Sequence, residues 1–532
     1  MPQKPINSIF NWFIRRRMAD IELARRESVA AQQAVFAGLL HHAKDTQFGR
    51  EHGLKEVNNL REFKRRVPVR TYDEFKPWID AARAGEMDVI WPGKIQWFAK
   101  SSGTTSDRSK FLPVTEEALQ SCHYKGGKDL LALYCDAVPT ARLYEGKHLV
   151  LGGSSALHAD GSGAYTGDLS AIIIRNLPFW VEARRTPGRN IALMEDWTEK
   201  VDAMARTTMK QDVRILAGVP SWMLVVGKRI LELSGKSHLG EVWPDLQLYM
   251  HGGVSFAPYR KNFEELIGST QSPVSYMETF NASEGFFGLQ DRIGEEDMLL
   301  MCDYGIHFEF VPKGSWHSEF PETLELNDLE VGALYALVIS TNAGLWRYAL
   351  GDVIRITEKH PFRMQVVGRT SMCLNAFGEE VMVAQTDRAI QQACECTGAA
   401  IRDYTVGPVF MSANETGGHE WAIEFDQLPS DMMRFRDALD SDLEKANSDY
   451  AAKRTGGLAM SAPIIRQVPQ GTFEMWLRSK GKVGGQHKVP RLGGDRIILQ
   501  EVLSLAKWAP RESRVMDGIG EQVEQDGFGE HT

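Results

Sequence analysis

A short stretch rich in small hydroxyl residues could bind phosphate. It reads FAKSSGTTSDRSKFLPVT and follows a strand-like IQWFAK segment. Small polar side chains on an open backbone can surround phosphate oxygens with N–H and O–H donors. We predict a phosphate cradle made by Ser101, Ser102, Gly103, Thr104 and Thr105.

Lys110, a few residues further on, could add a positive charge to this loop. The segment lacks the Gly-Lys-Ser/Thr ending of a Walker A loop. The alternative interpretation is a Ser/Thr-rich surface turn, and the loop alone does not decide between the two.

A second segment, SYMETFNASEGFFG, combines an aromatic residue with small residues and a carboxylate. A β-like run ends at Phe280, and Asn281, Ala282, Ser283 and Glu284 follow it. An aromatic face can hold a purine, and a carboxylate just beyond it can coordinate Mg²⁺ through oxygen. Taken alone, the segment is better explained by a core aromatic residue at the end of a strand, followed by a capped turn.

A third segment, TNAGLWRYALGDVIRI, places Arg347, Tyr348, Gly351 and Asp352 where one predicted strand turns tightly into the next. An ionised Asp352 offers two acceptor oxygens, which suits the two hydroxyl groups of a ribose. Asp after Gly is also an ordinary hairpin residue. A binding role for Asp352 is favoured only because the other segments occur in the same sequence.

A fourth segment, GGQHKVPRL, carries Lys488 immediately before Val489 and Pro490. The flanking Gly and Pro predict a loop. A lysine delivered by a mobile domain could neutralise the negative charge of a pentavalent phosphorus. An isolated lysine is otherwise normally solvent-facing.

The elements that position these segments change along the chain. The first third has helical periodicity, and from about Lys147 short apolar runs separated by Gly and Pro alternate with helix-length stretches. This alternation predicts an α/β sheet. A strand-like segment ends at Gly368 and Arg369, where we expect a hinge. The predicted domains are a large doubly wound α/β domain over 1–371 and a smaller, mobile α+β domain over 372–532.

Composition narrows the classes of function. With 532 residues, of which 43% are hydrophobic, the chain should form at least two folding units. The net charge of −9 disfavours nucleic acid as a partner. We expect no membrane partner because no apolar stretch approaches the roughly 20 residues of a spanning helix. Six cysteines without metal-site spacing favour reduced thiols and a cytoplasmic protein. The basic run at 15–17 is expected to be a solvated helix face.

Taken together and in this order, the four segments resemble the auxin-responsive acyl-acid amido synthetases. These enzymes belong to the adenylate-forming superfamily that includes firefly luciferase and acyl-CoA ligases. The resemblance covers nearly the whole chain, and its most discriminating match is the ending QGTFEM…GGQHKVPR, which is similar to GGTFEE…NQYKVPR of the family. The chain departs from the family pattern at Phe280 and Ala349, where the family has Tyr and Arg, and after Thr105, where the family has more Gly.

The resemblance implies roles for individual residues. ATP phosphates would be held by the loop at 101–105, Phe280 would flank adenine, Glu284 would serve Mg²⁺ and Asp352 would bind the ribose. Lys488 would assist adenylation, and Arg369 matches the Gly-Arg pair at the superfamily's hinge. The expected cofactors are therefore ATP and Mg²⁺.

Three functions follow, in order of preference. The first is an ATP-dependent ligase that joins a small acyl acid to an amino acid and releases AMP and pyrophosphate. The second keeps the adenylation step but transfers the acyl group to a thiol. The third is an inactive protein that only binds a metabolite. His158 and His251 lie near Gly-rich segments and could act as bases, although an isolated His is more often structural. The sequence does not predict the acyl acid or the oligomeric state.

Overall fold

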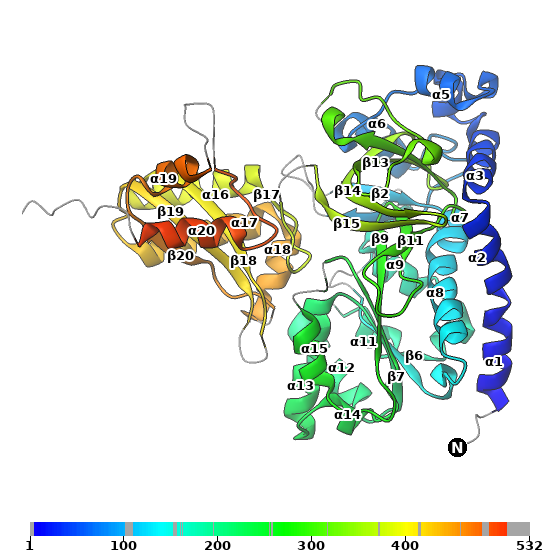
Figure 1. The fold of residues 1–532 in the computed structure, drawn as a ribbon, viewed down its shortest axis with the longest axis horizontal. Coiled ribbons are helices and arrows are strands. Elements are labelled where there is room, and N and C mark those ends of the chain that lie inside the picture. The colour runs from blue at the N-terminus through cyan, green and yellow to red at the C-terminus, as the bar shows by residue number, and fades with distance from the viewer. Residues whose placement is uncertain are drawn as a thin grey trace, which may run out of the picture.

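In the computed structural model, the described residues are 5–101, 110–152, 157–159, 161, 163–194, 196–254, 256, 259–316, 318–370, 373–412, 416–457, 459–480 and 489–507. Figure 1 shows two bodies of unequal size: a large one with the N-terminal part of the chain and a smaller one with the last helices and strands. Within these ranges, the helices are too short or too polar to cross a bilayer.

One mixed sheet organises the large body. Among the described residues its strand order is β12-β13-β14-β15-β11-β10-β9-β8-β7-β3-β6. The strands from β9 to β6 pair in parallel, and those from β12 to β9 pair antiparallel. Their bounds are β3 Lys147–Val150, β6 Arg185–Thr186, β7 Val213–Ala217, β8 Leu248–Gly252, β9 Ser275–Ala282, β10 Gly285–Leu289, β11 Met298–Leu300, β12 Ile306–Pro312, β13 Leu334–Thr341, β14 Tyr348–Lys359 and β15 Phe362–Arg369.

A second, smaller sheet has the order β2-β1-β5-β4. Its strands are β1 Trp97–Ser101, β2 Lys110–Val114, β4 His158–Ala159 and β5 Tyr165–Gly167. The helices of the large body are α1 Pro5–Arg15, α2 Arg17–Arg26, α3 Ser28–Ala43, α4 Gln47–Glu51, α5 Leu60–Arg66, α6 Tyr72–Arg83, α7 Glu116–Ala118, α8 Tyr124–Ala137, α9 Leu169–Arg175, α10 Phe179–Glu182, α11 Arg189–Ala192, α12 Trp197–Thr208, α13 Pro220–Ser234, α14 Leu239–Val242 and α15 Arg260–Ile267.

Helices cover both faces of the parallel half of the large sheet. Ile215 of β7 packs in the core that includes α8, whereas the next residue, Leu216, packs in the core that includes α12 and α13. Successive side chains of a strand point to opposite faces, so the sheet is buried on both sides. The predicted doubly wound α/β fold is confirmed, with an antiparallel half added to the parallel one.

The smaller body contains a short sheet and several helices. Its strands are β18 Ala400–Val409, β19 Gly418–Gln427 and β20 Ile464–Val468, and a separate ribbon joins β16 Cys373–Leu374 to β17 Val381–Met382. The helices are α16 Val383–Thr397, α17 Met432–Ala446, α18 Ser448–Arg454, α19 Thr472–Ser479 and α20 Ile497–Ala506. Hydrogen bonds tie this body to the large one: Tyr259 Oη donates to Ala376 O at 2.5 Å, and Asn262 Nδ2 donates to Met411 O at 2.6 Å.

Two segments of helical composition each form two helices rather than one. The pattern that begins ADIELARR divides at Glu27, whose φ of −113° and ψ of 36° separate α2 from α3. The pattern that begins DMMRFRD divides at Asn447, which is extended and accepts hydrogen bonds from the backbone N–H groups of Asp449 and Tyr450. Such a cap satisfies N–H groups that a new helix leaves unpaired, and it therefore favours a break.

The basic run at 15–17 was expected to be a solvated helix face, and this expectation is wrong for two of its three arginines. Arg17 donates from Nε to the buried carboxylate of Asp129 at 2.8 Å. Arg15 donates from Nη2 to Asp136 at 2.8 Å, and both acceptors lie on α8. Two of the three arginines therefore attach the N-terminal helices to the body of the protein, a role that charge patterning alone does not reveal.

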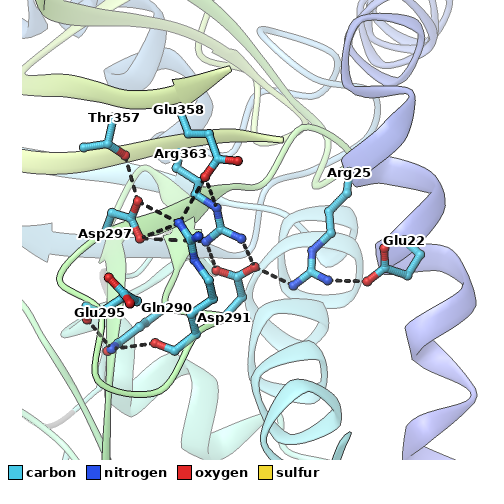
Figure 2. Close-up of polar contacts among 10 residues, drawn as sticks. Glu22, Arg25, Gln290, Asp291, Glu295, Asp297, Thr357, Glu358 and Arg363 are labelled. Carbon is cyan, nitrogen blue, oxygen red and sulfur yellow. Dashed lines mark hydrogen bonds and ion pairs between the residues drawn. The ribbon is translucent and has the colours of Figure 1, made fainter. Parts of the chain in front are cut away.

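An ion network fastens the end of α2 to the antiparallel half of the sheet (Figure 2). Arg25 Nη2 and Arg363 Nη2 both donate to Asp291 Oδ2, at 2.5 and 2.7 Å. The Asp291 side chain is fully buried. Glu358 and Asp297 lie on the other side of Arg363. Two guanidinium groups thus compensate the buried carboxylate, which is the condition for keeping such a charge inside a protein.

Arg347 has a structural role at the start of β14. Its guanidinium donates from Nε and Nη2 to the two oxygens of Glu309, at 2.8 and 2.9 Å, and from Nη1 to the carbonyl of Val67 at 2.8 Å. Both charged side chains are almost fully buried. The φ of Arg347 is 44°, a left-handed conformation that is uncommon for a residue with a side chain. The buried pair therefore fixes the path of the chain into β14.

Replacing Glu309 with Gln should lower the free energy of unfolding by about 3–5 kcal/mol, because the buried Arg347 would lose its counter-charge. Urea titration followed by tryptophan fluorescence measures the change. Asp437→Asn, which removes an exposed partner of Arg436, is the matched control and should cost less than about 1 kcal/mol. Equal losses from the two variants would contradict this role.

Candidate active site

The β1–β2 hairpin holds the two ends of the hydroxyl-rich loop together. Its last paired residues are Ser101 and Lys110. Lys110 is 7% exposed, so its side chain is buried rather than solvated. The other residues predicted for the cradle lie outside the described residues; they are Ser102, Gly103, Thr104 and Thr105.

Lys110 lies in an environment that contains both apolar groups and carboxylates. Burial lowers its pKa, and the negative charge of Glu284 acts in the opposite direction. Its Nζ is 5.5 Å from the centre of the Tyr72 ring. The hydroxyl of Tyr72 accepts a hydrogen bond from the backbone N–H of Phe111 at 2.9 Å, which holds the ring beside the hairpin. The lysine at the end of the loop is thus positioned by packing.

Glu284 lies at the tip of a second hairpin. Strands β9 and β10 pair Ala282 with Gly285, so Ser283 and Glu284 form the two-residue turn. Burial raises the pKa of Glu284, while the positive charge of Lys110 lowers it. Because each of these two charges shifts the pKa of the other, the loop end and the hairpin tip must lie near one another.

Phe280 lies near the end of β9, as predicted. Its ring centre is 4.9 Å from that of Phe287, at an interplanar angle of 58°. One side of the Phe280 ring thus packs on the core, and the side chain is only partly buried. Asn281 is exposed, and the hydroxyl of Thr279 donates to its Oδ1 at 3.0 Å.

Asp352 and Arg369 face each other across β14 and β15. Arg369 Nε is 3.2 Å from Asp352 Oδ1, and Arg369 Nη1 is 3.0 Å from Glu380 Oε1. Asp352 was expected at a tight turn between strands. It lies instead within the twelve-residue strand β14, directly after Gly351, whose φ is 89°. The φ of this glycine departs from regular strand geometry, and the register with β15 shifts just beyond it, between Val353 and Ile354.

The carboxyl group of Asp352 is strongly perturbed. Burial raises its pKa to about 7, the charge of Arg369 opposes the shift, and the nearby charges of Glu380 and Glu284 add to it. Lys110 also acts on this group. A titratable group perturbed by burial together with specific charges is typical of a functional site.

The hydroxyl of Tyr348 is a further polar group in this region. The side chain is fully buried, and within the described residues its Oη has no hydrogen-bond partner. Burial raises the Tyr348 pKa well above its ordinary value, and the negative charge of Glu284 adds to this shift. Leaving a buried hydroxyl without a hydrogen-bond partner costs free energy. A bound ligand would remove that cost by supplying the missing partner.

Comparison with known proteins supports the resemblance seen in the sequence. Three family models match in order along the chain: the GH3 family N-terminal domain over residues 17–272, the central domain over 299–369 and the C-terminal domain over 384–497. The chain belongs to the GH3 family. The predicted family is therefore confirmed.

Similarity to individual GH3 proteins extends over most of the chain. Indole-3-acetic acid-amido synthetase GH3.3 of Arabidopsis thaliana is 25% identical, over 88% of this chain and 90% of that protein. The structure of AtGH3.15 acyl acid amido synthetase in complex with 2,4-DB is 19% identical with a TM-score of 0.60, over 92% of this chain and 95% of that one. A structure of 2-hydroxyisobutyryl-CoA ligase with 2-HIB-AMP and CoA is 15% identical with a TM-score of 0.54, over 91% and 94%. The two structures show that the fold is shared.

Four predicted site residues of this GH3 protein come together in the structure. Ser101, Glu284, Asp352 and Arg369 come from three hairpins, and Lys110 adds a cation at the base of the first. Lys488 lies outside the described residues. The residues that follow it are anchored to the smaller body: Val489 is buried, and Pro490 O accepts a hydrogen bond from Thr405 Oγ1 at 2.7 Å.

Glu380 is a site residue that sequence reasoning missed. It lies beyond the predicted hinge, and its φ of 41° turns the chain so that its carboxylate reaches Arg369. The adjacent residue, Glu379, is fully buried against His419, with 2.8 Å between Oε1 and Nε2. The sequence GEEV gives no sign that Glu379 faces inward and Glu380 faces Arg369.

The two histidines considered as bases differ in environment. His251 at the end of β8 is buried, and its ring stacks on Phe256 with 3.9 Å between ring centres. Burial, aided by the charge of Arg260, lowers the pKa of His251 to about 3. It is therefore neutral and weakly basic at neutral pH. His158 is exposed on the two-residue strand β4.

Magnesium fits the donor set of this region. The five charged residues at its centre are two cations, Lys110 and Arg369, and three carboxylates, Glu284, Asp352 and Glu380. Among the described residues, no three His, Cys, Asp or Glu side chains form a metal cluster. Mg²⁺ is commonly held by one or two carboxylates together with nucleotide phosphates, so Glu284 alone would suffice on the protein side.

Asp352→Asn should be more stable than the wild type above pH 7. The folded-state pKa of Asp352, about 7, lies above the ordinary value of 3.8, so ionising this group costs the folded protein stability progressively from about pH 4 to pH 7. A neutral amide avoids that cost, by on the order of 1 kcal/mol or more at pH 8. Urea titrations of both proteins at pH 5 and pH 8 measure it.

The same variant should bind ATP more weakly, because Asn offers one acceptor oxygen where the carboxylate offers two. A variant that gains stability and loses the ligand distinguishes a binding residue from a structural one. Lower stability at pH 8 with unchanged ATP affinity would contradict the assignment of Asp352.

Proposed function

We propose that the chain is an ATP-dependent acyl-acid amido synthetase. It would adenylate a small carboxylic acid and transfer the acyl group to an amino acid, with release of AMP and pyrophosphate. One observation supports this proposal most: in a member of the GH3 family, the base of the hydroxyl-rich loop lies within electrostatic reach of Glu284, Asp352 and Arg369. These residues come from separate parts of the sequence, and the chemistry of adenylation requires them in one place.

In the proposed site, the nucleotide would contact each hairpin through a different part. The cradle at 101–105 and the ammonium of Lys110 would hold phosphate oxygens. The Asp352 carboxylate would accept hydrogen bonds from the ribose hydroxyls. The partly exposed face of Phe280 would contact adenine, beside the small residues that follow it.

The first half-reaction would form a mixed anhydride. A carboxylate oxygen of the acyl acid attacks the α-phosphorus, the bond to the β,γ-phosphates breaks, and pyrophosphate leaves. Negative charge builds up on the phosphoryl oxygens in the transition state, so fixed cations such as Lys110 would lower the barrier. Mg²⁺, held by Glu284 and the phosphates, would supply further charge stabilisation.

The second half-reaction would form the amide. A neutral amine attacks the acyl carbon, AMP leaves with the bonding electrons, and the amine loses a proton. The acyl adenylate is already activated, so positioning the amine can be sufficient and a covalent enzyme intermediate is not required. The proposal accordingly assigns no catalytic serine or cysteine.

Lys488 and the smaller body would complete the site for adenylation. With a domain boundary at 371/372, Arg369 lies at the hinge and Glu380 lies beyond it. Rotation of the smaller body would break the ion pair between Arg369 and Glu380, whose side chains are 14% and 26% exposed. The domain boundary, the role of Lys488 and the cytoplasmic location stay predictions.

The acyl acid is left open, because the related proteins differ. One is named for indole-3-acetic acid, and a solved structure holds 2,4-DB. We expect ATP–pyrophosphate exchange that depends on one of a panel of small aromatic, indole or aliphatic carboxylic acids. Exchange with none of them, together with no binding of ATP, would overturn the proposal.

The acceptor is tested separately from adenylation. With the acid that supports exchange, amino acids should increase AMP release and yield an amide detectable by mass spectrometry. Coenzyme A should do neither. A thioester product with no amide would keep the adenylation chemistry and replace the amino acid by a thiol acceptor.

Lys110→Met should reduce the rate of pyrophosphate exchange about 100-fold, since it removes a cation beside the reacting phosphates while keeping the bulk of the side chain. The matched control is Lys261→Met on α15, whose side chain is highly exposed. The control should exchange at the wild-type rate. An unchanged rate in Lys110→Met would remove this residue from the proposed site.

A further inference from the structure

Helices α1 and α2 form one rod along the outer edge of the large body (Figure 1). Arg16, between them, keeps helical angles of φ −60° and ψ −26°. The inner face of the rod is pinned to the protein: Asn7 Nδ2 and Asn11 Nδ2 both donate to Ala141 O at 2.9 Å, and Ile14 and Ile21 are buried. The rod therefore cannot turn to bury its other face.

That outer face is apolar at both ends. Ile9, Trp12 and Phe13 are 67%, 62% and 58% exposed, and Leu23 is 57% exposed. The spacing of these residues places them on one face of a continuous helix. Large apolar side chains that gather on one surface, rather than lying scattered, indicate an interaction site. The region matched by the GH3 family model begins at residue 17, after Ile9, Trp12 and Phe13.

Two opposite charges separate the apolar ends. Arg16 is exposed, and its guanidinium lies 4.3 Å from the centre of the Trp12 ring. Asp20, one turn further on, has a side chain that is 61% exposed. Along the rod the outer face thus presents apolar residues, a cation, an anion and a final apolar residue. Reversing the direction of the rod exchanges the two charges and keeps apolar residues at both ends, so the pattern is complementary to itself.

We propose that this outer face binds a second copy of the chain, with the two rods packed antiparallel about a two-fold axis that passes between them at the level of residue 18. Arg16 would then pair with Asp20 of the other copy, twice by symmetry, and Phe13 would pack on Leu23 of the other copy. Such an isologous contact uses the same patch on both subunits, which is the commonest arrangement in homo-oligomers. Helices whose apolar faces meet in this way bury them from water.

An anionic membrane surface would fit the same face less well. The neighbouring basic residues are already paired, Arg15 with Asp136 and Arg17 with Asp129 and Asp20. Arg15 and Arg17 are therefore neutralised within the chain, and Arg16 is followed one turn on by Asp20, so this stretch does not present the cluster of unpaired cations that attracts anionic lipid. Balanced charges in a fixed order favour a partner that carries the complementary order.

Sedimentation velocity of the full chain at micromolar concentration tests the proposal. The wild type should sediment as a dimer, and Arg16→Asp and Asp20→Arg should each raise the dimer dissociation constant at least about tenfold, because like charges would face each other twice. Mixing the two variants should restore a dimer, since an acidic pair on one chain then meets a basic pair on the other at both symmetric positions. The restored dimer also shows that both variants are folded.

A second pair of variants tests the apolar contact. Phe13→Ser should weaken the dimer, whereas Phe320→Ser, at a phenylalanine that lies outside the rod and is 78% exposed against 58% for Phe13, should not. A monomeric wild type, or equal weakening by both serine variants, would overturn the proposal. Failure of the mixed charge variants to form a heterodimer would also overturn it, as would co-sedimentation of the monomer with phosphatidylglycerol vesicles. Pyrophosphate exchange by the same variants is measured in parallel, so loss of the dimer is distinguished from loss of the proposed activity.

Discussion

The ion pair between Asp352 and Arg369 is the constraint on which the proposed site depends. Both side chains are mostly buried, and Glu380 supplies a second carboxylate to the same guanidinium, so Arg369 keeps a counter-charge even where Asp352 is neutral. The register of β14 with β15 places the two residues opposite each other. Upstream, the buried pair of Arg347 and Glu309 fixes the start of β14. The position of the candidate ribose-binding carboxylate is thus set by the packing of the antiparallel half of the sheet.

The same ion pair connects the two bodies of the protein. Arg369 is the last residue of β15, and the backbone N–H of Thr370 donates to Gly351 O at 2.8 Å, next to Asp352. Glu380 belongs to the segment that begins the smaller body. A nucleotide that contacts Asp352 would therefore act on a residue bonded to both bodies. This gives a physical route by which binding and the arrangement of the smaller body can influence each other.

Much of this architecture could be predicted from the sequence because its signals are local. Short apolar runs, such as those at β7, β8 and β12, predicted strands that the structure contains. The segment around Phe280 predicted a strand followed by a turn, and the structure contains both, whereas the tight turn expected at Gly351 and Asp352 is part of β14 instead. The family resemblance predicted that the site segments meet. The breaks at Glu27 and Asn447 were missed because both lie inside strongly helical composition. At Asn447 a single capping side chain favours the break, whereas Glu27 departs from helical backbone angles without a side-chain cap.

What the sequence could not predict depends on contacts between distant segments. Arg16 and Arg17 are neighbours of identical charge in the sequence. Their environments differ because Arg17 contacts the buried Asp129, which lies on another helix. Glu379 and Glu380 are adjacent and chemically identical, yet Glu379 contacts the buried His419 and Glu380 contacts Arg369. The position of Lys110 in the sequence is equally compatible with a solvated loop residue. Its side chain is buried because the residue lies on the β1–β2 hairpin.

The most direct test of the central claim is a crystal structure of the protein with bound AMP. The account predicts that the ribose hydroxyls lie within hydrogen-bond distance of the Asp352 carboxylate, with the α-phosphate next to Lys110 and the residues that follow Ser101. AMP bound at another place, with the Asp352, Arg369 and Lys110 side chains making no contact to it, would contradict the account.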